Sequence, residues 1–382
     1  MGEKTAQEKE RELVEWAAKL GAEIRPYVIE HDRDGTFVAE AFTVLIEAGY
    51  LALAVPEELG GRGATIRQVA MAQRELARHC ASTALASTMH HHIVLFNAWR
   101  WRRELPGAEA LLRRIVDENL LLVSTGGADF TRPRGEAVKV EGGYRVSGTK
   151  IFASQSPVGN VMSTMFPYDD PEEGRIVLNT SVPLSAEGVR VLDNWDAMGM
   201  RGTGSGDIEL TDVFVPDDKI AARRPYGVLD PVLQSVVAHA LPPIIAVYLG
   251  VAESARDEAV AAVTGTSKAE DPGMQRRIGL MDTRLRVAAW ALDGALAAVG
   301  DNPTPSQENV ATAMAAKQAV SEAAIEACDL AMEAVGGSAY FKGNAVERAY
   351  RDVRGIKFHP LDPEQALRFT GKLTLGLPVD EM

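Results

Sequence analysis

The feature that most limits how this chain can fold is a stretch of β-type patterning, residues 121–216, between two long helical blocks. Residues 138–140 and 144–146 alternate apolar and polar side chains around the turn 141–143, which predicts a hairpin with a Gly-rich turn. Further short apolar runs follow at residues 149–154, 176–178 and 207–215. Strands that are segregated from helices indicate α+β architecture rather than alternating βαβ units.

Both flanking blocks show helical periodicity. Near the N-terminus apolar residues fall at three- and four-residue steps, and Thr65 is the expected N-cap of a helix that begins at Ile66. After the β block come three long apolar or Ala-rich segments, residues 231–263, 274–299 and 306–335. Pro242-Pro243 is expected to interrupt the first. Small residues at this density favour a tight bundle and a homo-oligomer, either a dimer or a tetramer.

We therefore expect three domains. They are an N-terminal all-α domain of residues 1–120, a middle β-barrel or β-sandwich domain of residues 121–218, and a C-terminal four-helix bundle of residues 219–382.

The composition limits the cellular compartment and the classes of partner that we expect for the protein. A net charge of -13 argues against a nucleic-acid surface, which needs clustered Lys and Arg. The two cysteines, Cys80 and Cys328, lie far apart in helical patterns, so we expect buried thiols in a reducing cytoplasm. The charged residues 1–12 do not resemble a secretory signal, and we expect no membrane span.

Three adjacent histidines, residues 90–92, interrupt a helical segment rich in Ala, Ser and Thr. Successive helix positions are ~100° apart, so the three cannot share a face, and the i, i+4 spacing of helical metal ligands is missing. We expect no metal site. One or two of these imidazoles could point into a cleft, and a polar helix edge is the alternative.

Four patterns in order resemble the acyl-CoA dehydrogenase superfamily of flavoproteins over nearly the whole chain. They are YLALAVPEELGG at residues 50–61, GYRVSGTK at 143–150, MGMR at 198–201 with VFVP at 213–216, and VGG at 335–337 with ERAYRD at 347–352. The resemblance implies a helical, β, helical domain order, bound FAD with FMN as a possibility, and a cytoplasmic homotetramer.

The resemblance also implies which residues meet the flavin. Ser154 stands where family members put a hydroxyl against the ring, Phe152 would stack nearby, and Ser124 would meet the pyrimidine edge. Ordinary strand residues are the alternative. Gly336 and Gly337, together with Glu333, belong to the element that reaches the flavin of a neighbouring subunit. Close backbone approach to an extended cofactor favours glycine there.

The sequence departs from the family where the catalytic base should be. Ordinary members remove an α-proton from an acyl thioester while hydride leaves Cβ, which needs a carboxylate. Pro360 stands in the usual place of the glutamate, and the second location used by some members is Ala240, with His239 beside it. The Arg-x-x-Phe-Gly pattern is replaced by residues 265–272, where Lys268 lacks the bidentate fork of Arg.

A monooxygenase branch of the superfamily looks similar at these places. Its members take reduced flavin from a reductase, use oxygen, and rely on histidines, which titrate near neutral pH. On this resemblance His359, His91 and Ser154 are the candidate catalytic residues.

Three functions follow. The first is an FAD-dependent dehydrogenase that oxidises the Cα-Cβ bond of an acyl-CoA or acyl-carrier thioester, passes electrons to a partner, and uses a displaced base such as Asp362 or Glu364. The alternative is a two-component monooxygenase acting on a small acyl or aromatic molecule with reduced flavin and O2. The third is a flavin-binding subunit that has lost catalysis.

Overall fold

The computed structural model describes residues 5–379. Its N-terminal part consists of helices α1 (Ala6–Ile24), α2 (Val28–Asp34), α3 (Ala39–Glu47), α4 (Ile66–Ala77), α5 (Ala81–Trp101) and α6 (Ala108–Glu118). Helix α4 begins where the sequence predicts, because the Thr65 side chain accepts a hydrogen bond from the Gln68 N–H and the Gln68 side chain accepts one from the Thr65 backbone.

Within residues 5–379, eight strands form two four-stranded sheets. The strands are β1 (Leu122–Ser124), β2 (Glu136–Val140), β3 (Gly143–Lys150), β4 (Val161–Asp170), β5 (Gly174–Pro183), β6 (Val189–Val191), β7 (Ile208–Pro216) and β8 (Ile220–Pro225). One sheet has the order β1-β4-β5-β8 and the other β2-β3-β7-β6. Only the β1–β4 pair among these strands is parallel.

The two sheets share one apolar core, so the middle domain is a sandwich. Val146 of β3, Phe166 of β4 and Ile208 of β7 belong to the same buried cluster. The predicted hairpin is present, with Val138 of β2 opposite Arg145 of β3. Strand β8 pairs with β5, so the sheet includes residues beyond the expected domain boundary at 218.

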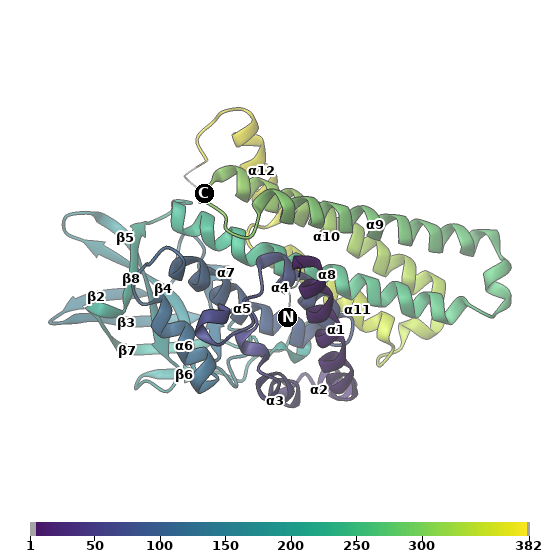
Figure 1. The fold of residues 1–382 in the computed structure, drawn as a ribbon, viewed down its shortest axis with the longest axis horizontal. Coiled ribbons are helices and arrows are strands. Elements are labelled where there is room, and N and C mark those ends of the chain that lie inside the picture. Colours follow the sequence, from purple (N-terminus) through teal and green to yellow (C-terminus); the bar gives the residue numbers. More distant parts are fainter. Residues whose placement is uncertain (1–4, 380–382) are drawn as a thin grey trace.

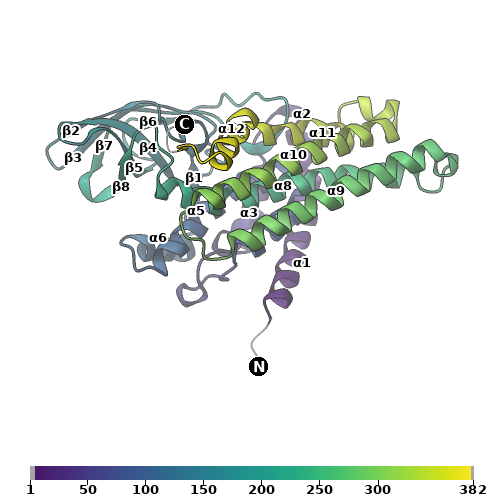
Figure 2. The ribbon, with the colours of Figure 1, turned by 90° about the horizontal axis from the view of Figure 1, so that it is seen from above.

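The C-terminal part is built around one long helix. It consists of α8 (Pro231–Val263), α9 (Pro272–Val299), α10 (Gln307–Val335), α11 (Ala345–Asp352) and α12 (Pro363–Thr374). Figures 1 and 2 show α8, α9 and α10 running side by side, with the sheets at one end of the molecule. Together with the N-terminal helices and the sandwich, this is the predicted α+β arrangement, which the family comparison below confirms.

The predicted interruption at Pro242-Pro243 is wrong, because α8 runs through both prolines. Helices α4, α5, α9 and α10 all pack on α8, and this packing outweighs the local cost of the prolines. By length and apolar composition α8 could cross a membrane, but 94% of its most apolar window is buried inside the protein, which is typical of a core helix.

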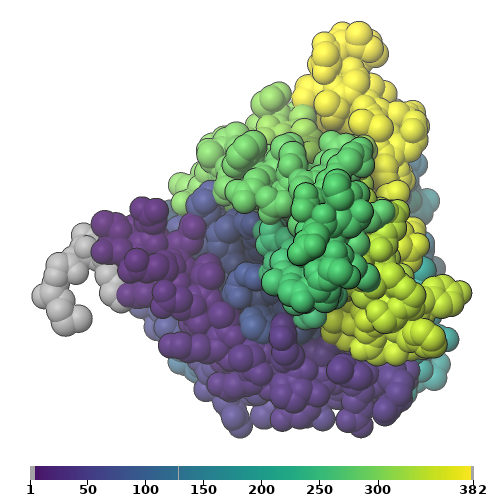
Figure 3. Space-filling model, turned by 90° about the vertical axis from the view of Figure 1, so that its right-hand side faces the viewer, coloured from purple at the N-terminus to yellow at the C-terminus, as the bar shows by residue number. Residues whose placement is uncertain are grey.

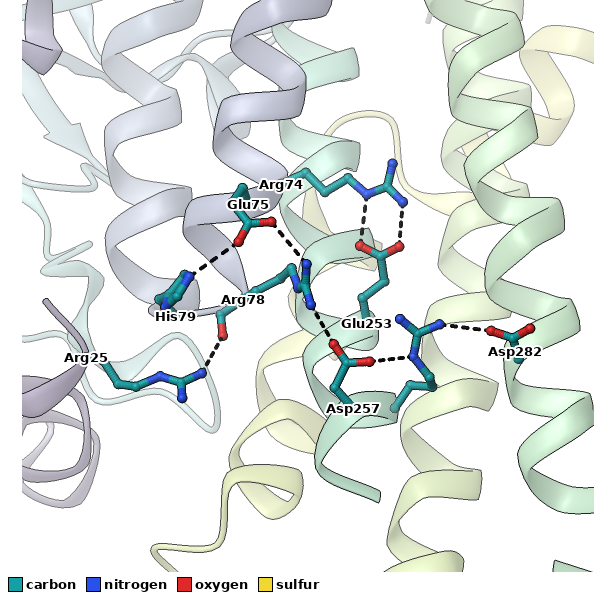
Figure 4. Close-up of polar contacts among 9 residues, drawn as sticks. Arg25, Arg74, Glu75, Arg78, His79, Glu253, Asp257 and Asp282 are labelled. Atoms are coloured by element: carbon teal, nitrogen blue, oxygen red, sulfur yellow. Dashed lines mark hydrogen bonds and ion pairs between the residues drawn. The ribbon is translucent and has the colours of Figure 1, made fainter. Parts of the chain in front are cut away.

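Charged pairs bind the N-terminal helices to this bundle (Figure 4). Arg74 of α4 donates to both carboxylate oxygens of Glu253 of α8, at 2.9 and 2.5 Å. Arg78, which follows α4, pairs with Asp257 of α8 at 2.6 Å. Figure 3 shows the molecule from the end of the bundle, where the green α8–α9 turn stands between purple N-terminal helices and yellow C-terminal segments.

Candidate active site

Ser154 lies in a buried cluster of hydroxyl groups just after β3. Its Oγ is 2.8 Å from the Ser205 Oγ, which is 2.7 Å from the Thr203 Oγ1. Thr203 belongs to a single 3-10 turn, η4 (Arg201–Thr203), and its hydroxyl donates to the Met200 carbonyl. The predicted residue is therefore held by the segment that carries the MGMR motif of residues 198–201, a motif far from Ser154 in the sequence.

Gln155, the next residue, joins this cluster to β1. Its N–H donates to the Thr203 carbonyl at 2.9 Å, and its Nε2 donates to the Leu122 carbonyl at 2.7 Å. The Gln155 Oε1 is buried and has no partner. A buried acceptor without a donor is costly, so it marks a place where a bound group with an N–H or O–H would fit.

Phe152 presents its ring at the edge of the same segment. Its φ is +58°, a left-handed conformation that is uncommon for an aromatic residue, and its side chain is half exposed. The ring stands edge-on to Trp195, with centroids 6.1 Å apart. A strained backbone that exposes an aromatic ring beside a hydroxyl cluster is consistent with a surface for a flat ligand.

Ser124 ends β1 and leads into the short helical turn α7 (Gly126–Asp129). A Cβ placed on Gly127 would lie 4.0 Å from Pro360 Cδ, so α7 packs beside the residue that follows His359. Lys150 anchors α7, donating to Asp129 Oδ2 at 2.5 Å with both side chains buried. Burial lowers the pKa of Lys150, and the Asp129 carboxylate opposes that shift.

His359 follows the 3-10 segment η8 (Val353–Phe358) and forms a hydrogen bond with the core of the bundle. Its Nε2 is 2.8 Å from the Tyr248 hydroxyl of α8. The Lys317 Nζ of α10 donates to the His359 carbonyl at 2.5 Å and to the Leu361 carbonyl. Burial, helped by the Lys317 charge, lowers the pKa of His359 to about 3, and burial raises the pKa of Tyr248 far above its ordinary value. At neutral pH the pair is an uncharged imidazole and an uncharged phenol.

Sequence reasoning missed Tyr248 and Lys317. Each is a polar residue inside a long apolar or Ala-rich helical segment, and that mismatch was the available signal.

The histidines at 90–92 point in different directions, as helical geometry requires. The His90 Nδ1 accepts the Leu122 N–H at 3.1 Å, so its Nε2–H donates to the Leu51 carbonyl at 2.9 Å. His91 is fully buried edge-on to Tyr50, and neither ring nitrogen has a partner. Among the described residues, no hydrogen bond joins His91 to His359 or Ser154. Burial holds the pKa of His91 well below its usual range.

The Gly336–Gly337 turn lies at the end of the bundle remote from the sheets (Figure 1). Gly336 has φ +83° and ends α10, where Lys268 donates to the Val335 carbonyl at 3.3 Å. Glu333, one turn earlier, forms an exposed pair with Arg277 at 2.9 Å. Within one chain these residues are not brought together with Ser154.

Two acids follow closely after Pro360 in the sequence. Asp362 and Glu364 are both exposed, and Asp362 caps α12 by accepting the Gln365 N–H at 2.9 Å. Arg351 pairs with Asp32 at 2.6 Å and with Glu347 on its own helix. Asp352 accepts the Met200 N–H, so the Arg-Asp motif ties α11 to the η4 segment.

Comparison with known proteins identifies the family. The acyl-CoA dehydrogenase N-terminal, middle and C-terminal domain models match residues 7–101, 124–213 and 231–359. L-evernosamine nitrososynthase of Micromonospora sp. is 30% identical over 97% of this chain and 91% of the relative. The chain belongs to the acyl-CoA dehydrogenase family. The resemblance inferred from four motifs is thus confirmed, and so is the predicted fold class.

Two further similarities are informative about this acyl-CoA dehydrogenase family member. The putative acyl-CoA dehydrogenase YdbM of Bacillus subtilis is 29% identical over 93% of this chain and 94% of its own length. A structure of KijD3 in complex with FMN and dTDP-3-amino-2,3,6-trideoxy-4-keto-3-methyl-D-glucose has a TM-score of 0.90 at 30% identity, covering 97% of this chain and 95% of that chain. Other relatives include a monooxygenase and two hydroxylases at 26–27% identity and a probable acyl-CoA dehydrogenase at 25%. These comparisons support the conclusion that the protein is a flavin-dependent oxidoreductase. They favour monooxygenase chemistry over oxidation of an acyl thioester, and FMN over FAD as the flavin.

Proposed function

We propose that this protein is a two-component flavin-dependent monooxygenase that receives reduced flavin, FMN rather than FAD, from a separate reductase and oxidises a small molecule with O2. The observation that carries the proposal is the His359–Tyr248 pair beside Pro360, where a dehydrogenase of this family needs a carboxylate. An uncharged imidazole hydrogen-bonded to a phenol can relay a proton without either group staying charged, whereas the exposed Asp362 caps α12.

The residues around Ser154 fit a flavin. Its hydroxyl cluster, the unpartnered Gln155 Oε1 and the exposed Phe152 ring offer hydrogen bonds beside a flat surface, and Ser124 stands at the end of the adjoining strand. When bound, reduced flavin supplies the two electrons that monooxygenation needs. In the net reaction one oxygen atom of O2 enters the substrate and the other leaves as water. In this reaction Ser154 holds the flavin ring, and His359 relays a proton at its Nε2.

A second copy of the chain completes the site in this proposal. Gly336, Gly337 and Glu333 lie at the remote end of the bundle, so they reach a flavin only in a neighbouring subunit of a homo-oligomer. The glycines allow that close approach because neither carries a Cβ, and a Cβ on Gly337 would meet no atom of its own chain within 4 Å. We propose a cytoplasmic location, since Cys80 and Cys328 are buried free thiols.

The decisive experiment offers the protein both chemistries. Purified protein is supplied with FMN, a flavin reductase and NADH, and oxygen uptake and an oxygenated product are followed with a panel of amines and phenols. In parallel, FAD-loaded protein is mixed anaerobically with acyl-CoA thioesters of several lengths. Flavin bleaching by an acyl-CoA, without any oxygenated product in the first arm, refutes the monooxygenase.

Variants assign the role of the His359–Tyr248 pair. His359→Gln and Tyr248→Phe are each expected to lower turnover at least tenfold while flavin binding stays within twofold. The matched control is His31→Gln, which alters a partly exposed imidazole on α2 that pairs with Glu40. Unchanged turnover in His359→Gln removes the proposed proton-handling role.

A further inference from the structure

The interface between α5 and α8 contains polar atoms that the fold leaves without partners. The His239 Nε2, the Ser235 Oγ and the His92 Nδ1 are all buried and unpartnered. The three residues are only 1%, 2% and 7% exposed. Each such atom lowers the stability of the fold while it stays unpaired. A cluster of them marks a place that a ligand would complete, and nothing in the proposed proton or flavin chemistry uses it.

The hydrogen bonding of His239 fixes what it can recognise. Its Nδ1 is 2.6 Å from the Ser235 carbonyl oxygen, which can only accept, so Nδ1 carries the hydrogen. Burial, together with the charges of Arg103 and Arg102, lowers the pKa of His239 to about 4 against the raising effect of the Ser235 bond. The neutral ring therefore offers a bare lone pair at Nε2. It accepts one hydrogen bond and donates none there.

Aromatic rings form the wall around this acceptor. Phe96 and Trp99 of α5 are stacked, with centroids 5.8 Å apart, and each stands edge-on to the His239 ring at 5.9 Å. The Trp99 Nε1 donates to the Pro303 carbonyl at 2.7 Å, which holds the indole in place. An apolar wall with one acceptor suits a carbon skeleton that carries a single hydroxyl or N–H.

Positive charge stands beside the aromatic wall. Arg103 lies over the Trp99 ring, with its Cζ 4.0 Å from the ring centroid, so the site disfavours an ammonium group and favours an uncharged donor.

We propose that His239 is a specificity-determining residue whose Nε2 accepts a hydrogen bond from a hydroxyl or uncharged N–H of the molecule to be oxidised. Ser235 supplies a second polar contact, and Phe96 and Trp99 hold the apolar skeleton. This assignment rests on the proposed function, because it takes the α5–α8 interface as part of the substrate site of the monooxygenase.

The test uses two probes of similar size, phenol with a donor and toluene without one. Binding of each to the full-length protein is measured by calorimetry, without flavin or oxygen. His239→Leu is expected to weaken phenol binding about tenfold and leave toluene within about twofold, since one hydrogen bond is lost. His239→Gln, whose amide oxygen can still accept, is expected to keep part of the phenol affinity. His31→Leu is the control and should change neither.

Each result of these binding measurements either supports or overturns the proposed role of His239. Failure of wild-type protein to bind phenol, or an equal loss of both probes in His239→Leu, overturns the proposal. Phe96→Ala should weaken both probes, and unchanged binding there shows that they bind elsewhere and also overturns it. Because the binding arm needs no turnover, a preference that depends on His239 without any oxygenated product would refute the proposed function and leave the site standing.

Discussion

Replacing Lys150 by Met tests whether a buried ion pair holds the turn beside Ser124. The ammonium donates to Asp129 Oδ2, to the Arg134 carbonyl at 2.7 Å and to the Met165 carbonyl at 2.6 Å. Lys150 and Asp129 have 0% and 2% exposed side chains, so the substitution leaves a carboxylate buried without its counter-charge. Breaking such a pair costs about 3–5 kcal/mol, which for a chain of this size lowers Tm by on the order of 4–6 °C.

Thermal unfolding followed by fluorescence measures the shift, with flavin titration as a second readout. Lys139→Met is the matched control, since Lys139 forms an exposed pair with Asp217 beside the same sheet and its loss should cost under about 1 kcal/mol. Adding Asp129→Asn to Lys150→Met removes the stranded charge and should restore at least half of the lost stability. The reasoning is refuted if Lys150→Met shifts Tm no more than Lys139→Met, or if the double variant recovers nothing.

Three other changes probe the fold. Burial lowers the pKa of His90 to about 4 and of His92 to about 3, whereas an unfolded imidazole titrates near 6.5, so the unfolded state binds more protons between these values. Their stabilising effect is complete above about pH 6.5 and falls with decreasing pH, by about 2 kcal/mol per histidine at pH 5, and urea unfolding at pH 7 and 5 should reveal it. Arg74→Met leaves Glu253 partly buried and unpaired, so it should cost about 1–3 kcal/mol in the same assay, and an added Glu253→Gln should recover part of that cost. Gly61→Ala puts a Cβ 2.2 Å from the Val55 carbonyl oxygen, so backbone must move and Tm should fall by several degrees; an unchanged Tm contradicts so close an approach of the two segments.

Local features of the fold were predictable from local sequence. The β2–β3 hairpin and the Thr65 cap depend on residues within a few positions of each other, so alternation and capping rules are enough. The continuity of α8 through Pro242-Pro243 was not predictable, because it depends on helices that surround it in space. Propensity is a weak guide where tertiary packing decides.

The candidate site shows the same division. Motif resemblance led to Ser154 and His359, but not to the groups that position them. Thr203 and Tyr248 are 49 and 111 residues away from those positions, and no periodicity links them. Among the adjacent histidines, helical geometry predicted different directions, yet only the packed structure gives each its neighbours, with His91 against Tyr50.

The central position of α8 has a consequence for how the protein can be divided. Its side chains complete the interior of the N-terminal helices as well as that of the bundle, and Arg74 and Arg78 reach across to it. A fragment that stops before Pro231 would lose the partner of α4 and α5 and expose their apolar faces to water. The N-terminal helices and the C-terminal bundle look separate in the sequence, but they should fold, unfold and be degraded together as one cooperative unit.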